Sequence, residues 1–219
     1  QVALHGQSFK HAATTDNLLP GYPAAVPGWL NIGVLHTALE GYSAHARYAP
    51  CSLAELQARG YQYWALGHVH EQQLWAYPDC TIAFPGNLQG RHVRETGARG
   101  ALLVHADDDR ITQVQPLELD VLRWAVLEVS VAEADTFEQA VRLVGQSLQQ
   151  LLAALPDGHP AAVRVRLQGA TAAHAALLAR QSQLRQEVIG QAVALDAVRL
   201  WIETVQLTSS PLERQALDD

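Results

Sequence analysis

The chain has 219 residues, of which 48% are hydrophobic and 17% are charged, with 15 Gly and 10 Pro. These proportions are typical of a folded protein of one large or two small domains, and they exclude a disordered chain. The formal net charge of -7 argues against strong stand-alone binding of duplex DNA. No apolar run approaches the roughly 18 residues that a membrane span needs, so we expect a cytoplasmic protein without membrane contact.

Cysteines and tryptophans are both expected in the interior. Cys51 and Cys80 lack Cys-x-x-Cys spacing, so they indicate neither a disulfide framework nor a thiolate zinc site and are expected as buried free thiols. The five tryptophans lie among apolar neighbours, which favours core positions over base-stacking platforms: Trp29, Trp64, Trp75, Trp124 and Trp201.

Short apolar strands and loops alternate in the first half of the chain. Ser52 and Glu55 have capping-box spacing and predict a short helix that ends before Gly60. Runs rich in β-branched and aromatic residues predict strands, and D-D-D-R at 107–110 predicts the turn of a hairpin. The expected strands are 31–35, which ends at His36, then 61–66, 81–84, 100–105 and 111–117.

The second half has longer periodic segments. Thr136 and Gln139 cap a predicted helix over 137–155, and Thr171 is expected to open a second helix of about 20 residues. Strands are expected at 124–131, 162–167 and 198–207, with Arg164 and Arg166 on a solvent-facing side. The order β-α-β-α-β predicts a small α+β domain with its helices on one sheet face. Eight of ten His and all six Tyr precede residue 119. We therefore expect the first half of the chain to carry the functional side chains and the second half to be structural.

Three histidines are candidate metal ligands. His68 and His70 stand two residues apart behind Gly67, and side chains at this spacing point the same way in an extended backbone. His36 ends another predicted strand, and ligands collect at the carboxyl ends of strands in α/β proteins. The alternative for His68 and His70 is a loop with two hydrogen-bonded imidazoles.

Three motifs carry a family resemblance: N-I-G-V-L-H-T at 31–37, Y-W-A-L-G-H-V-H at 63–70 and F-P-G-N-L-Q-G-R-H at 84–92. They resemble the later motifs of the calcineurin-like metallophosphoesterases, and in particular of the SbcD-type DNA repair exonucleases. The resemblance implies an α/β to α+β fold. Residues 1–118 would form part of a metallophosphoesterase β-sandwich flanked by helices, and residues 119–219 a small α+β capping domain that selects DNA.

The resemblance also implies a site with two divalent metal ions, usually manganese, that hydrolyses phosphodiesters. His36, His68 and His70 would be metal ligands, and imidazole is compatible with manganese, iron or zinc. The third motif supplies Asn87, Arg91 and His92 as substrate-binding candidates.

Arginines gather in and after this third motif. Arg91, Arg94 and Arg99 lie within nine residues, and guanidinium groups suit the phosphates of a DNA backbone. The alternative is a solvated loop in which an arginine pairs with Glu95.

The family's earlier motifs, Asp-x-His, Gly-Asp and Gly-Asn-His, do not occur at the expected place. They would supply the remaining metal ligands and the histidine that protonates the leaving group, so no catalytic residue is assigned here. Asp157, Gly158 and His159 match Asp-x-His by letters but are expected to form a turn. The chain begins with Gln1 and has no methionine. We therefore expect the C-terminal part of a nuclease, which alone binds metal weakly or partially and is inactive.

The resemblance implies DNA as the substrate of the parent enzyme and an SMC-like coiled-coil ATPase as its partner, and it leaves a homodimer open. Two alternatives remain at this point. A two-metal site also suits a phosphodiesterase or phosphatase that acts on a small molecule. Alternatively, the chain is a non-catalytic module that docks DNA or the ATPase.

Overall fold

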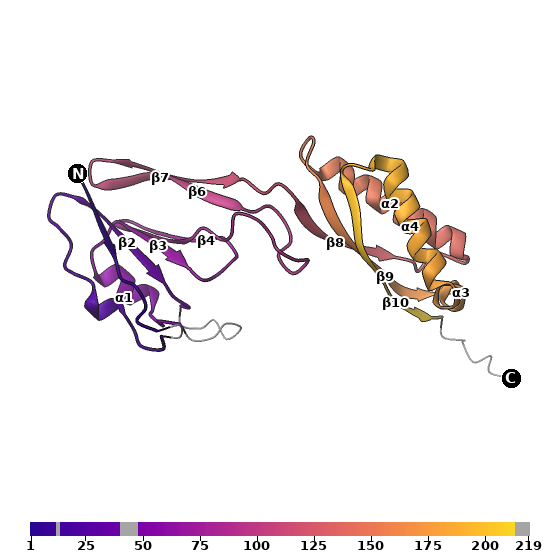
Figure 1. Ribbon diagram of the computed structural model, residues 1–219, viewed down its shortest axis with the longest axis horizontal. Helices are drawn as coiled ribbons and strands as arrows, with labels where there is room; N and C mark the ends of the chain where they lie inside the picture. The colour runs from indigo at the N-terminus through magenta and orange to yellow at the C-terminus, as the bar shows by residue number, and fades with distance from the viewer. Residues whose placement is uncertain (12–13, 40–47, 213–219) are drawn as a thin grey trace. The chain divides into compact units, whose positions relative to one another are not determined.

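The computed structural model describes residues 1–11, 14–39 and 48–212 (Figure 1). The chain divides into two compact units. The first contains Gln1–Leu88 and Arg99–Leu119, and the second contains Gln89–Ala98 and Asp120–Asp219. The short segment Gln89–Ala98 therefore belongs to the unit that follows it, and it is discussed with that unit.

A five-stranded sheet in the order β1-β2-β3-β5-β4 forms the centre of the first unit. β1, β2, β3 and β5 are parallel, and only β4 runs antiparallel, beside β5. The unit also contains a 3₁₀ turn, the short helix α1 and a two-stranded hairpin of β6 and β7. Their bounds are β1 Val2–Gly6, 3₁₀ turn Leu19–Gly21, β2 Leu30–His36, α1 Leu53–Ala58, β3 Tyr63–Gly67, β4 Gln73–Tyr77, β5 Cys80–Phe84, β6 Gly100–Asp107 and β7 Arg110–Glu118.

The core of the first unit is built around Trp64, which is completely buried on β3. Its indole Nε1 donates a hydrogen bond to the Leu56 carbonyl of α1 over 3.0 Å. Its ring stacks on Tyr61 at a centroid distance of 4.9 Å and lies 5.3 Å from the ring of Tyr22. Trp64 is paired in register with Gly33 of β2, where an added Cβ would lie only 2.3 Å from the indole ring. Glycine at position 33 therefore lets the indole cover the neighbouring strand.

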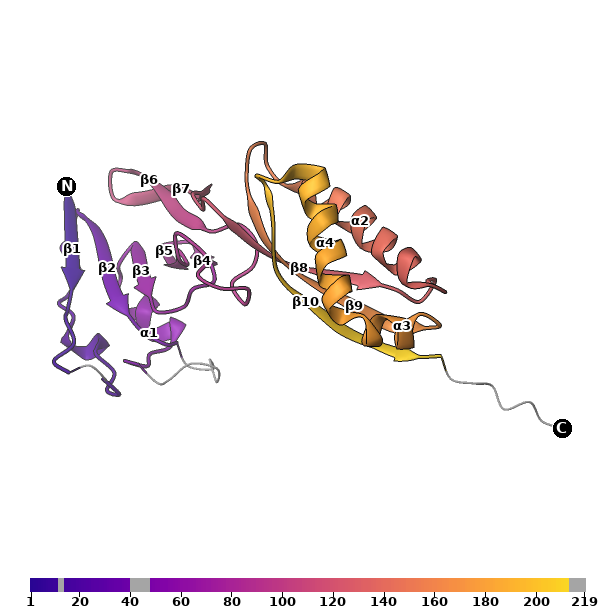
Figure 2. The same cartoon turned by 45° about the vertical axis from the view of Figure 1, so that its right-hand side comes forward.

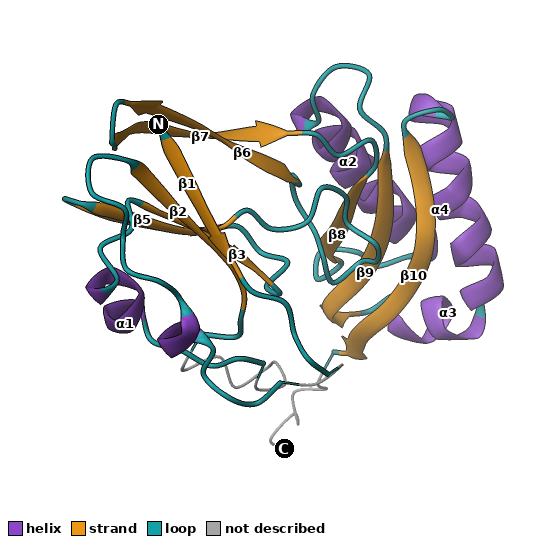
Figure 3. Cartoon of the chain, turned by 60° about the vertical axis from the view of Figure 1, so that its left-hand side comes forward, coloured by secondary structure: helices purple, strands orange, loops and turns teal. Residues whose placement is uncertain are grey.

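The helix and the hairpin of this unit lie on opposite sides of the sheet (Figures 1 and 3). Ser52 and Glu55 form the expected capping box at the start of α1. The backbone and side-chain hydrogen bonds from Ser52 lower the pKa of the Glu55 carboxyl group, because they favour its charged form. The hairpin turns at Asp107–Arg110, as expected.

The second unit is a three-stranded parallel sheet in the order β10-β9-β8, with its helices on one face (Figures 2 and 3). α2 begins with the predicted capping box of Thr136 and Gln139. Alternate aliphatic residues of the strands pack against α2 and α4 in a single core, which includes Val163, Val165 and Leu148. The bounds are β8 Arg123–Ser130, α2 Phe137–Ala154, β9 Ala161–Thr171, α3 His174–Ala179, α4 Gln181–Asp196 and β10 Leu200–Pro211.

The other face of this sheet is polar and internally paired. Arg164 donates two hydrogen bonds to the Glu203 carboxylate, at 2.8 and 2.7 Å, and this contact lowers the pKa of Glu203. Arg166 donates to Gln206 and to Glu128. The predicted solvent-facing side of β9 is thereby confirmed, and its arginines neutralise carboxylates of the same sheet.

Most predicted elements are confirmed within a few residues, including the Asp157–His159 turn, where the amide of His159 donates to the Pro156 carbonyl. Both cysteines are free and buried, as expected. Strands β1 and β4 were missed. Trp29 and Trp201, both predicted in the core, are 37% and 62% exposed. Among the described residues, no helix is long and apolar enough to cross a membrane.

The prediction that Thr171 opens a long helix is wrong. Thr171 ends β9, and its hydroxyl donates to the Ala134 carbonyl and accepts from the Ala173 amide. The expected helix is divided into α3 and α4 at Arg180, whose φ of -120° and ψ of 35° are not helical. The side chain of Thr171 satisfies nearby backbone groups in a turn, a use of threonine that competes with helix capping.

The contact between Gly33 and Trp64 predicts a cost for any side chain at position 33. Gly33→Ala should lower the free energy of unfolding by about 1–3 kcal/mol, because the indole must shift to admit the methyl group. Urea unfolding followed by tryptophan fluorescence measures this. Gly6→Ala on β1 is the matched control, because its added Cβ would have neighbours no closer than 3.9 Å. Equal stabilities of the two variants would contradict the prediction.

Candidate metal centre

Two of the three predicted metal ligands meet at the carboxyl end of the first unit's sheet. His36 is the last residue of β2, and His68 follows the last residue of β3. The His36 Nε2 atom lies 3.2 Å from the His68 Nδ1 atom, and the ring centroids are 5.1 Å apart. Pairing of His36 with Gly67 in the sheet produces this meeting, because it brings residue 68 beside the end of β2.

Gly67 allows the close approach of the His36 ring. A Cβ at residue 67 would lie 3.1 Å from His36 Nδ1. His68 has a φ of 110°, a backbone conformation that a non-glycine residue adopts only when its surroundings impose it. β3 ends at Gly67, so the extended backbone assumed for residues 68–70 is not present. Side-chain direction at His70 therefore does not follow from the spacing.

The histidine pair fits two ligands of one divalent ion. Two imidazole nitrogens bound to the same ion at about 2.0–2.1 Å lie roughly 3 to 3.4 Å apart, and the observed separation falls in this range. The same distance also suits a hydrogen bond between the rings. No group of three or more His, Cys, Asp or Glu among the described residues is placed to hold a metal ion, so His70 does not complete a triad with this pair. His70 as a ligand remains a prediction.

His70 instead has a clear backbone role in the first unit. Its carbonyl accepts a hydrogen bond from the Arg99 guanidinium at 2.6 Å and another from the backbone amide of Asn87 at 3.3 Å. Gly86 has a φ of 80°, and a Cβ there would lie 2.9 Å from the same carbonyl. The F-P-G-N segment therefore packs against the G-H-V-H segment through its backbone. This contact places Asn87 next to His70.

The Q-G-R-H segment belongs to the second unit. The side chain of Gln89 donates to the Leu122 carbonyl and accepts from the amide of Val121, and the indole of Trp124 donates to the Gly90 carbonyl. These bonds attach the segment to the start of the second unit. The predicted substrate residues Arg91 and His92 are thus carried by this unit.

Glu95 organises the charged side chains of this segment. It is buried, and its carboxylate accepts from the backbone amide of Arg91 at 2.8 Å. The same carboxylate lies 3.5 Å from the Arg91 guanidinium and 3.6 Å from the His92 ring. The Arg91 side chain remains 64% exposed, so it can contact Glu95 and still present donors to solvent.

Two aromatic residues near the histidine pair were missed in the sequence. Phe9 lies edge-on to His36, with ring centroids 5.7 Å apart, and Tyr48 lies 5.1 Å from the ring of His68. Both residues come from loops and have no motif spacing to the histidines. No sequence signal could have placed them here, because loops of irregular structure bring them in.

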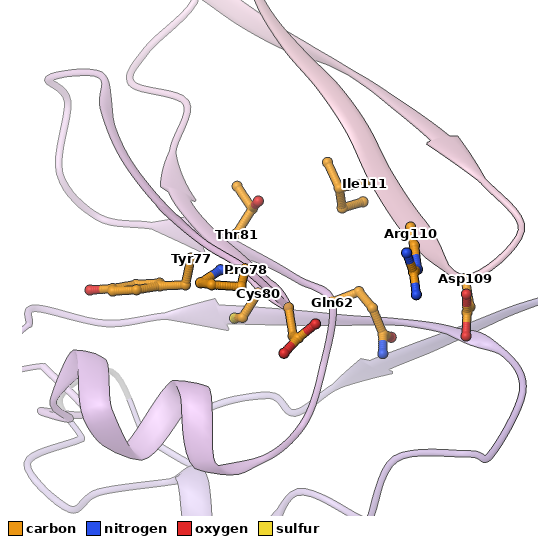
Figure 4. A pocket seen from close by; sticks show the side chains of 9 residues that line it. Gln62, Tyr77, Pro78, Cys80, Thr81, Asp109, Arg110 and Ile111 are labelled. Atoms are coloured by element: carbon orange, nitrogen blue, oxygen red, sulfur yellow. The ribbon is translucent and has the colours of Figure 1, made fainter.

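A cavity of about 440 Å³ lies at the opposite, amino ends of β3 and β5, where the tip of the hairpin meets the sheet (Figure 4). Figure 4 shows Gln62, Asp109 and Arg110 gathered on one side of it. Burial raises the pKa of the Cys80 thiol in its wall to about 11, so the thiol is protonated at neutral pH and is a poor nucleophile. Cys80 therefore supplies this cavity with no reactive thiolate at neutral pH.

Comparison with known proteins supports a relationship to the metallophosphoesterases, a hydrolase family whose members use divalent metals. Residues 124–210 match the family model described as metallophosphoesterase YhaO, middle domain. Over 168 residues the chain is 33% identical to the uncharacterized metallophosphoesterase YhaO of Bacillus subtilis (strain 168). The match covers 77% of this chain and 40% of that protein, so the chain spans well under half the length of the relative.

The histidine pair predicts a metal-binding defect on removal of either ring. His36→Ala and His68→Ala should each weaken Mn²⁺ binding by about tenfold or more, because an ion loses a direct nitrogen ligand. Isothermal titration calorimetry measures this, with the exposed His105→Ala as the matched control. His70→Ala tests the third predicted ligand. Unchanged affinity in both His36→Ala and His68→Ala would show that the two rings form only a hydrogen bond.

Proposed function

We propose that this chain, a relative of the metallophosphoesterases, is the histidine-bearing and capping part of a DNA repair nuclease of the SbcD type. The parent enzyme hydrolyses phosphodiester bonds with two divalent ions, preferentially manganese. The observation that carries this proposal is that His36 and His68 meet at the carboxyl ends of the parallel strands β2 and β3, at a separation that suits one ion.

The chain's own residues have separable tasks in this reaction. The rings of His36 and His68 would hold one ion, with His70 as a further ligand, while the close packing at Gly67 keeps the His36 ring in place. Bound ions would neutralise phosphate charge and acidify a water molecule for attack. As neutral ligands, the imidazoles would leave the positive charge of the ion available to the phosphate.

Two imidazoles are too few ligands for a two-metal centre, so we propose that this chain alone is inactive. Further ligands, and the acid that protonates the leaving group, would come from other parts of the parent protein. Exposed apolar residues on the edge strand β1 and on its neighbour β2 favour additional polypeptide along β1. Val2 and Leu4 of β1 are 56% and 70% exposed and Val34 of β2 is 43% exposed, whereas edge strands of soluble proteins usually carry charges.

The second unit would act as a cap that helps to select DNA. Its segment Gln89–Ala98 presents Arg91, held near the buried Glu95, and the exposed Arg94. Guanidinium groups bind phosphate oxygens through paired donors, which makes these residues candidates for contacts with the DNA backbone. The proposed protein partner of the parent enzyme is an SMC-like coiled-coil ATPase.

The proposal predicts how nuclease activity depends on chain length and metal. The full-length natural protein should degrade DNA in the presence of Mn²⁺, and a chelator should abolish this activity. These 219 residues alone should show none above background. Release of nucleotides from labelled single-stranded DNA measures both. Robust, chelator-sensitive activity of the 219 residues would contradict the incomplete site, and hydrolysis of small phosphodiesters but not DNA would contradict the nuclease.

A phosphate contact by Arg91 predicts a change in the salt dependence of DNA binding. In the full-length protein, Arg91→Ala should weaken binding more at low salt than at high salt. It should also reduce the slope of log affinity against log salt by about one. Fluorescence anisotropy with a labelled oligonucleotide measures this, and Arg110→Ala at the tip of the hairpin is the control. An unchanged slope would indicate that Arg91 serves only its pairing with Glu95.

A further inference from the structure

The rings of Phe9 and Tyr48 are placed together beside the histidine pair. Their planes are inclined by only 5°, and their centroids are 6.4 Å apart. Each ring also contacts one of the histidines, Phe9 the edge of His36 and Tyr48 the ring of His68. Four planar side chains from four different segments thus converge at the carboxyl ends of the strands.

These two aromatic residues do not serve the core of the first unit. That core is centred on Trp64 and its buried neighbours, whereas Phe9 and Tyr48 are both only half-buried. Aromatic pairs in proteins have centroids about 4.5–7 Å apart, so the separation of Phe9 and Tyr48 is near the long end of this range. The two rings are parallel, and part of their surface remains exposed.

We propose that Phe9 and Tyr48 form a stacking site for a nucleobase of the substrate, next to the phosphate addressed by His36 and His68. This inference rests on the proposed function and adds the group that the site recognises beside the phosphate. Aromatic rings stack on any base, because every base presents a π-face. The site therefore accepts nucleotides without regard to sequence, as digestion of DNA of arbitrary sequence requires.

A nucleobase fits the pair better than the alternatives. A sugar phosphate without a base presents hydroxyl groups, whereas the side chains here offer mainly flat apolar surface and a single phenol. Inorganic phosphate requires charge, and neither Phe9 nor Tyr48 supplies any. The aromatic pair thus complements the histidines: the histidines address the phosphate through an ion, and the pair addresses the planar group attached to it.

Binding of two ligands to the full-length natural protein in the presence of Mn²⁺ tests the inference. The first ligand is deoxyadenosine 5′-monophosphate, and the second is deoxyribose 5-phosphate, which lacks the base. Phe9→Leu and Tyr48→Leu should each weaken nucleotide binding by roughly 5- to 150-fold and leave sugar phosphate binding unchanged. Tyr48→Phe keeps the ring and should retain the affinity. Trp201→Leu, which removes an exposed aromatic ring of the second unit, is the matched control.

A second measurement needs no substitution. In the wild-type protein, stacking should shift the adenine protons of the bound nucleotide upfield in NMR spectra, while the sugar protons move less. Melting temperatures of the variants separate a local effect from loss of the fold. If Phe9→Leu and Tyr48→Leu weaken both ligands equally, or neither, or if the wild type gives no upfield shift, the inference is overturned.

Hydrolysis of single-stranded DNA by the same samples separates this inference from the proposed function. Base-dependent binding that is lost in the leucine variants, without hydrolysis by the wild type, supports the stacking site and contradicts the nuclease. Metal-dependent hydrolysis that is equal in the wild type and both variants supports the nuclease and contradicts the stacking site.

Discussion

The register between β2 and β3 is the constraint on which the candidate site depends. It pairs Gly33 with Trp64 in the middle of the strands and His36 with Gly67 at their ends. Because the indole occupies the space above Gly33, a slip by one residue would place it against a side chain and expose the apolar face of the strand. The packing that stabilises the core thus also sets the position of the histidines.

Gly33 and Gly67 make room for different side chains, one in the core and one at the candidate site. Gly33 lacks a side chain where the largest core residue needs room, and Gly67 lacks one where the His36 ring approaches. Substitution at the first would affect the stability of the sheet, whereas substitution at the second would displace a ring by a few tenths of an ångström. Stability and site geometry are therefore encoded by neighbouring positions of one pair of strands.

Local patterns predicted much of this structure, and long-range packing determined the rest. The β2 run, the capping boxes of α1 and α2 and the hairpin turn follow from short-range rules, so they were predicted correctly. The same rules placed His36 at a strand end. They failed where the backbone is irregular, as at His68 with its positive φ and at Arg180 between two helices. Phe9 and Tyr48 come from loops whose paths depend on tertiary contacts, so no periodicity could reveal them.

Charge also limits how a phosphodiester would approach the histidine pair at the carboxyl ends of β2 and β3. The chain carries a net charge of -7, which repels DNA at a distance. The histidines are neutral when they bind metal, and the aromatic rings of Phe9 and Tyr48 carry no charge, so these groups attract no phosphate by themselves. Attraction at this end of the sheet would then come from bound cations, because local charges of this kind can outweigh a weak overall field. In the proposed enzyme the metal ions would accordingly serve association as well as chemistry, whereas the aromatic pair would add affinity only after the phosphate has arrived.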